Sequence, residues 1–174
     1  WLRQEDPNLK IAVVEKNRVG FGASGRNAGF VTCGSVEHFN RMVGKHGEAQ
    51  ALEIWKFAEE NMNLLKKSII QDDVDLEFEQ KGAYSLAAQD SEYKELKEVA
   101  KIMSRHNIPV ELCPESDILK NVGAKDFVGG IRYVKDGAVN PSRLTEKILS
   151  LSRADVIEQT EVFRVSEKEG GARR

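Results

Sequence analysis

The feature that most constrains the fold is a short apolar run near the start of the chain. Residues 9–14 (LKIAVV) are almost entirely apolar and have polar residues on both sides. Such a strand is typical of a parallel sheet that is covered on both faces, because a strand with one wet face alternates apolar and polar residues. The run therefore predicts an α/β fold built around a parallel sheet.

A glycine-rich loop follows this strand directly. Residues 15–31 (EKNRVGFGASGRNAGFV) place one acidic residue, Glu15, ahead of four glycines. Residues 20–25 match G-x-G-x-x-G literally, but in a dinucleotide fingerprint the acidic residue comes about 20 positions after the glycines. The order is reversed here, and residues 26–34 (RNAGFVTCG) are poor helix formers. We therefore reject the literal match.

Glu15 better suits the acidic residue at the end of the second strand of a Rossmann-type unit. Its carboxylate offers acceptors to the hydroxyls of an adenosine ribose. The phosphate loop and the first strand would then lie upstream of Trp1, so we expect the sequence to be a fragment of a longer chain. A glutamate also ends an apolar strand by chance, which leaves a purely structural role open.

The loop after Glu15 has the chemistry of an anion-binding site. Small residues let the backbone approach a ligand closely, and successive amides form an anion-binding nest. Ser24 adds a hydroxyl, Arg26 a cation suited to phosphate or carboxylate, and Asn27 both a donor and an acceptor. The alternative is a mobile glycine loop with a surface arginine.

The remaining elements follow from periodicity and capping signals. Apolar residues at helical spacing predict helices over residues 47–71 and 93–103, and a helical turn begins at Pro114. Asn140 as N-cap and Pro141 at the first helical position predict a helix through residue 151. We expect further strands at residues 76–78, 84–88, 108–112, 128–134, 155–157 and 161–165. This order predicts a parallel-sheet domain interrupted by a second module.

Composition and charge limit the classes of partner that the protein can be expected to bind. The formal net charge is -2, with 26 basic and 28 acidic residues, which gives no reason to expect nucleic acid. No apolar run approaches the roughly 20 residues of a membrane span.

Cys33 and Cys113 lie far apart in no metal-binding spacing, so we predict no metal site and a reducing, cytoplasmic setting. His38, His46 and His106 stand in polar contexts, and no catalytic residue is assigned.

At this point the sequence resembles a known family. Glu15 followed by residues 18–29 (RVGFGASGRNAG) resembles the second-strand region of the FAD-dependent amine and amino-acid oxidases, the glycine and D-amino-acid oxidase family. Residues 81–84 (KGAY) resemble the start of that family's substrate domain, and residues 136–141 (DGAVNP) its return to the FAD domain. Residues 158–165 resemble the strand whose backbone meets the adenine. The resemblance thus covers nearly the whole chain.

The resemblance implies a fold and a domain plan. It implies an α/β protein with a Rossmann-type FAD-binding domain, whose first strand is missing here, interrupted by an α+β substrate domain. Residues 1–75 and 136–174 would belong to the FAD-binding domain and residues 76–135 to the substrate-binding domain.

The resemblance also implies a set of cofactor-binding residues. Glu15 would hold the adenosine ribose, Ser24 would lie near the pyrophosphate, and Val162 would meet the adenine through its amide and carbonyl. Three of the others would run along the flavin, mostly through backbone. The full set is Glu15, Ala23, Ser24, Arg26, Asn27, Gly29 and Val162.

The activity implied is oxidation of the C–N bond of a small amine or amino acid to an imine, with dioxygen as acceptor and hydrogen peroxide as product. Arg132, in the strand over residues 128–134, is a candidate for binding a substrate carboxylate, with a plain surface charge as the alternative. Two other classes stay open. One is another FAD or NAD oxidoreductase, a hydroxylase or a dehydrogenase, and the other is a non-catalytic nucleotide-binding module. The oligomeric state is not assigned.

Overall fold

The computed structural model describes residues 1–166, which divide into two compact units. Unit 1 comprises Trp1–Gly29 with the residues from Asn140 onward, and unit 2 comprises Phe30–Val139. By their contacts, residues 30–75 group with residues 76–139, whereas the sequence places a domain boundary at residue 75. The functional division into FAD-binding and substrate-binding segments stays a prediction.

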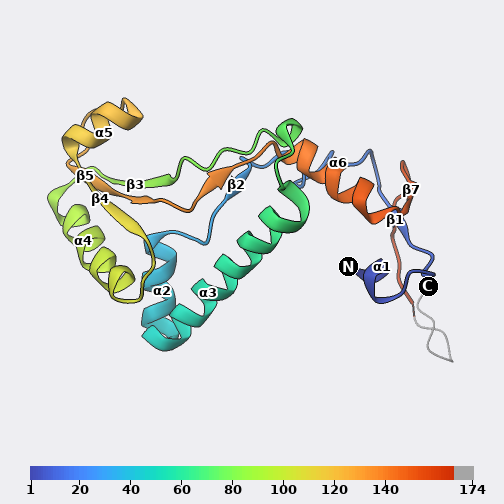
Figure 1. Cartoon of the computed structure of the whole chain (residues 1–174), viewed down its shortest axis with the longest axis horizontal. Coiled ribbons are helices and arrows are strands. Elements are labelled where there is room, and N and C mark those ends of the chain that lie inside the picture. The colour runs from blue at the N-terminus through green and yellow to red at the C-terminus, as the bar shows by residue number, and fades with distance from the viewer. Residues whose placement is uncertain (167–174) are drawn as a thin grey trace. The chain divides into compact units, whose positions relative to one another are not determined.

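Unit 1 is built on a pair of parallel strands. It contains α1 (Leu2–Glu5), β1 (Ala12–Val14), α6 (Pro141–Ser152) and β7 (Asp155–Ile157). β1 and β7 run side by side in parallel, with Val13 opposite Val156 (Figure 1). The parallel pairing predicted from the apolar run is therefore confirmed. The helix predicted from Asn140 is confirmed as well, because the Asn140 side chain accepts a hydrogen bond from the Arg143 amide at 3.2 Å.

Two expectations about these strands are wrong. β1 is not covered on both faces, since Val13 and Val14 are 37% and 40% exposed. Among the described residues only β7 pairs with it, and a two-stranded sheet has too little cover to bury both faces. The strand expected at residues 161–165 does not form, because regular pairing stops soon after β7 and residues 161–166 have no strand partner in the described part of the chain.

Unit 2 packs helices on an antiparallel sheet. The sheet has the order β3 (Ala83–Ala87), β5 (Gly129–Tyr133), β4 (Val110–Pro114). The helices are α2 (Val36–His46), α3 (Glu48–Leu65), α4 (Asp90–Arg105) and α5 (Glu115–Val122). A short antiparallel pair joins β2 (Phe30–Val31) to β6 (Gly137–Ala138). One apolar core unites α2, α3, α4 and the sheet, and it includes Phe39, Trp55, Met103 and Ile131.

Two elements of unit 2 differ from expectation. The strand expected at residues 76–78 is instead a 3₁₀ turn, Val74–Leu76, because the Asp73 side chain accepts from the Asp75 amide and starts a helical turn. α2 was not predicted at all. Its signal is present in the sequence, since Ser35 caps the helix by accepting from the His38 amide at 3.2 Å. α3 also continues into a π-helical turn, Lys66–Ile70.

Candidate cofactor site

Glu15 stands where an α/β sheet binds ligands, just past the carboxyl end of β1. Its amide donates to the Ile157 carbonyl and its carbonyl accepts from the Thr160 amide, both at 2.9 Å. One carboxylate oxygen, Oε1, accepts from the Asn17 amide at 2.8 Å. The second oxygen has no hydrogen-bond partner among residues 1–166. The side chain is thus oriented by one bond and can accept others from a ligand hydroxyl.

The glycine loop after Glu15 closes through a very tight backbone contact. A Cβ added to Gly25 would lie 2.2 Å from the Gly20 carbonyl oxygen, a separation that no side chain tolerates. Gly20 itself has a φ of +74°, a conformation that favours glycine. At Gly22, by contrast, an added Cβ meets nothing within 4 Å. The loop therefore needs bare backbone at specific positions rather than throughout.

The start of α6 holds this loop in place. The Ser142 hydroxyl donates to the Gly25 carbonyl at 3.1 Å. The Thr145 hydroxyl shares its one proton between the Pro141 carbonyl at 2.8 Å and the Ser24 carbonyl at 3.2 Å. Two side chains from the first turns of one helix thus bind two successive parts of the loop. These ties disfavour the alternative of a mobile glycine loop.

Asn27 folds the second half of the loop. Its Nδ2 donates to the carbonyls of Ala23 and Ser24 at 2.9 and 3.0 Å, and its Oδ1 accepts from the Gly29 amide at 2.8 Å. Gly29 is buried and has a φ of +71°. The Asn27 side chain is therefore used inside the loop, so that any contact it makes with a ligand would be through its backbone.

Two side chains of the loop keep donors for a ligand. The Arg26 guanidinium lies 4.1 Å from the centre of the Phe21 ring, a cation–π contact. The guanidinium N–H groups have no hydrogen-bond partner within residues 1–166. Ser24 is exposed on the same loop. Val162 is 60% exposed and lies outside any strand, and its expected contact with the adenine stays a prediction.

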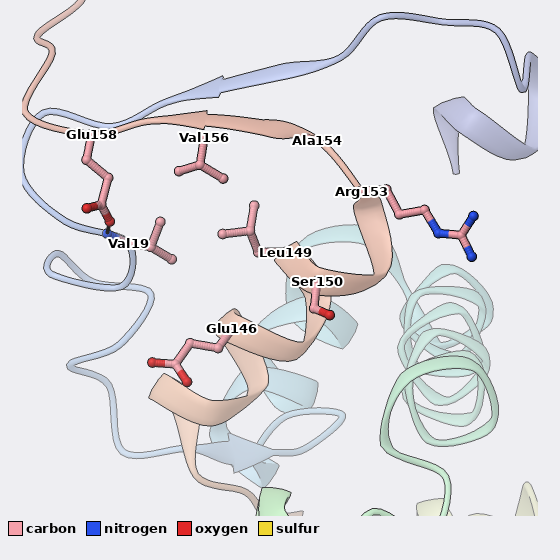
Figure 2. Close-up of a pocket in the computed structure, with 8 residues that line it drawn as sticks. All are labelled: Val19, Glu146, Leu149, Ser150, Arg153, Ala154, Val156 and Glu158. Carbon is pink, nitrogen blue, oxygen red and sulfur yellow. Dashed lines mark hydrogen bonds between the residues drawn. The ribbon is translucent and has the colours of Figure 1, made fainter.

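A separate open depression of about 620 Å³ lies between α6 and β7. Figure 2 shows Val19, Leu149 and Val156 turned toward one another in it, while the Arg153 side chain points away. The Glu158 carboxylate accepts from the Val19 amide at 2.8 Å and closes one end. None of the predicted cofactor residues lines this depression. Its lining combines residues of the consecutive elements α6 and β7 with Val19 from a loop distant in sequence, and no motif marks it.

Arg132 does not form a free carboxylate-binding group. Its Nε and Nη2 donate to the Lys81 carbonyl at 3.2 and 2.8 Å, and its Nη1 lies 3.0 Å from a Glu111 carboxylate oxygen. The guanidinium thus ties β5 to neighbouring backbone and to β4. The structure favours the alternative that the sequence left open, a surface charge with a structural role.

One histidine and both cysteines have surroundings that do not favour catalysis. His106 Nε2 lies 2.6 Å from a Glu48 carboxylate oxygen, an exposed pair between the ends of α4 and α3. Burial raises the pKa of the Cys33 thiol to about 11 and also raises the pKa of Cys113. Both thiols are therefore protonated at neutral pH and are poor nucleophiles.

Comparison with known proteins identifies the family. The model of the DAO family, described as FAD dependent oxidoreductase, matches residues 1–174. The chain belongs to this family. Among curated proteins it is 27% identical over 178 residues to a probable oxidoreductase, OrdL, of Haemophilus influenzae, covering 97% of this chain and 40% of that protein. It is 23% identical to gamma-glutamylputrescine oxidoreductase of Escherichia coli, covering 90% of this chain and 35% of that protein.

Solved structures confirm the fold. Glycine oxidase from Geobacillus kaustophilus superimposes with a TM-score of 0.67 at 21% identity, over 92% of this chain and 43% of that one. L-alpha-glycerophosphate oxidase from Mycoplasma pneumoniae, with FAD bound, gives a TM-score of 0.64 at 15% identity, over 95% of this chain and 42% of that one. The expected fold of an FAD-dependent oxidase is therefore confirmed, and the chain spans about 40% of the length of these relatives.

FAD is the cofactor of this oxidoreductase family. The loop of unit 1 fits such a group, because it combines a half-open carboxylate at a strand end, a tight bare-backbone turn and a guanidinium with available N–H groups. No helix in the described residues is long and apolar enough to cross a membrane.

Proposed function

We propose that unit 1 contributes the ribose and pyrophosphate part of the FAD site in an enzyme that oxidises the C–N bond of an amine or amino acid to an imine. The observation that carries the proposal is the Glu15 carboxylate, which Asn17 holds at one oxygen and leaves open at the other, at the carboxyl end of a parallel strand. The activity would be that of the whole protein, since the chain spans about 40% of its relatives' length.

Each residue of the loop has a separate task in this proposal. Glu15 accepts hydrogen bonds from the ribose hydroxyls, and Ser24 donates to the pyrophosphate together with loop amides. Arg26 supplies charged donors toward the phosphate and flavin side. Asn27 keeps the backbone of residues 23–29 in shape for the flavin through its three hydrogen bonds. Val162 meets the adenine through its backbone amide and carbonyl.

The substrate class rests on the relatives. One curated relative is named for gamma-glutamylputrescine, and solved neighbours include glycine oxidase and L-amino acid deaminase, all acting on amino compounds. Bound flavin would take up a hydride, which carries both electrons of the oxidation, while the amine nitrogen loses a proton, and the protein's part is to hold and orient the flavin. We further propose dioxygen as the acceptor, which gives hydrogen peroxide, and a cytoplasmic location.

The test of the cofactor role uses the protein at its natural length. Glu15→Ala should weaken FAD binding at least tenfold, about 1.4 kcal/mol, because the ribose hydroxyls lose a charged acceptor. Binding is measured by flavin fluorescence during titration of the apoprotein. Glu98→Ala is the control, since this exposed glutamate pairs with Lys101 in the same helix and lies outside the loop. Equal affinity in both variants would refute the ribose role.

The test of the reaction is separate. The flavin-loaded protein is mixed with amines and amino acids, and bleaching of the flavin and formation of peroxide are followed. Bleaching by an amino compound without NADH supports amine oxidation. Flavin reduced only by NADH indicates a hydroxylase, and a protein that purifies colourless and binds no added FAD is a nucleotide-binding module of another kind or an NAD enzyme.

A further inference from the structure

Unit 2 contains a small polar cavity that none of the proposed functions uses. It lies among α3, the turn between β5 and β6, and the segment after β2, with about 10 Å³ of room for the centre of a water-sized sphere. This is close to the space that one water molecule needs. The lining residues are Cys33, Trp55, Glu59, Ile108, Pro109, Tyr133, Lys135 and Asp136.

Trp55 lines this cavity and carries an unpaired donor. The side chain is 5% exposed and packs against Phe39 and Tyr133, with ring centroids 5.8 and 6.4 Å away. Its indole Nε1–H is buried and has no hydrogen-bond partner in the described residues. A buried donor without a partner costs about 1–3 kcal/mol, so native structures usually pair such groups with protein or with ordered water.

Asp136 brings an acceptor to the same cavity. It is 3% exposed and is the one charged residue that is fully buried within residues 1–166. Its carboxylate accepts one hydrogen bond, from the Cys33 amide, which leaves lone pairs on a group that has several. Three other polar side chains of the lining are engaged, since Lys135 pairs with Glu59 at 3.0 Å and the Tyr133 hydroxyl accepts from the Val36 amide at 2.7 Å.

We propose that this cavity holds one ordered water molecule, which accepts a hydrogen bond from Trp55 Nε1–H and donates one to the Asp136 carboxylate. The water satisfies the orphan donor and the open acceptor together. It also connects α3 to the turn before β6, and through the Cys33 amide to the segment after β2. The β2–β6 pair already joins two of these elements, so the water would fix the placement of α3 against them inside unit 2.

The first experiment is an NMR measurement on the natural-length protein with ¹⁵N-labelled tryptophan. Indole resonances are assigned with Trp55→Phe and Trp1→Phe. Under the proposal the Trp55 indole proton exchanges slowly with solvent and shows a through-space cross-peak at the water frequency. Asp136→Asn, which changes one end of the bridge but keeps its size, should shift the Trp55 indole proton and leave the Trp1 resonance unmoved.

A crystal structure decides the geometry. We expect a water oxygen within about 2.7–3.2 Å of both Trp55 Nε1 and an Asp136 carboxylate oxygen. The proposal is overturned if the cavity is empty, if Nε1 bonds directly to a protein acceptor, or if the Trp55 indole resonance shows no water contact and does not respond to Asp136→Asn.

Discussion

Units 1 and 2 are ordered by different forces. Every fully buried apolar side chain in the described residues lies in unit 2, between Val31 and Val139. In unit 1 the strand residues of β1 and β7 are all exposed. Its shape depends instead on hydrogen bonds from α6 and Asn27 and on the close backbone contact at Gly25. Unit 2 therefore derives its order from apolar burial, whereas unit 1 derives its order from polar contacts around a candidate ligand site.

The largest test of this difference compares two isoleucines. Ile131, fully buried in β5, should lose about 3–4 kcal/mol of unfolding free energy on replacement by alanine, through lost burial and the cavity left behind. Ile157, 47% exposed in β7, should lose about 1 kcal/mol or less in the same substitution. Urea unfolding of both variants gives the two values. Similar losses would mean that Ile157 is covered in the natural-length protein and that the contrast between the units does not hold there.

The second test concerns cofactor binding rather than the core. Gly25→Ala forces a methyl group against the Gly20 carbonyl, and we expect a loss of about 2–3 kcal/mol in FAD binding, a factor of 30 or more. Gly22→Ala is the matched control in the same loop, because its Cβ would meet open space. Flavin retention after gel filtration and titration of the apoprotein measure both. Loss of flavin in Gly22→Ala as well would show that the loop tolerates no side chain at all.

The sequence predicted unit 1 and unit 2 with different success. The acidic strand end, the parallel pairing and the Asn140 cap were predictable because each depends on a few adjacent residues. The three hydrogen bonds of the Asn27 side chain were not predictable, because they depend on the path that the loop backbone takes in the folded protein. The exposure of β1 was not predictable either. An apolar run indicates that a strand is buried by other residues, but it does not show which residues bury it.

In unit 2 the wrong or missing predictions of secondary structure arose where local hydrogen bonds outweigh the apolar periodicity of the sequence. Residues 76–78 alternate like a strand, yet the Asp73 side chain starts a 3₁₀ turn just before them. Ser35 caps the start of α2, but the glycines just before it are typical of a loop and give no helix signal of their own. Arg132 was placed in a strand correctly, while its partners, Lys81 and Glu111, come from segments that only the folded sheet brings together.

A third test uses the buried carboxyl group of unit 2. Burial raises the pKa of Asp136 from 3.8 to about 6, so the folded state holds this proton more tightly than the unfolded state does. Its contribution to stability is therefore complete below pH 3.8 and is lost as the pH rises through 6. Asp136→Asn has no such group and should gain about 2 kcal/mol over the wild type between pH 4 and pH 7. Unfolding free energies at both pH values give the difference, and an unchanged difference would refute the shifted pKa.

The smallest change in unfolding free energy is expected for a substitution at Arg132. This substitution tests whether Arg132 has a structural role or binds the substrate. Arg132→Ala removes its bonds to the Lys81 carbonyl and to Glu111, a partly exposed pair, and should cost about 0.5–1 kcal/mol of unfolding free energy. FAD binding and the KM for the amino substrate should not change, because we expect other residues to bind FAD and the substrate. Glu111→Gln is the companion variant, as it keeps the size of the partner and removes its charge. A several-fold rise in KM with Arg132→Ala and none with Glu111→Gln would restore Arg132 as the carboxylate-binding residue, and would move part of the substrate site onto β5.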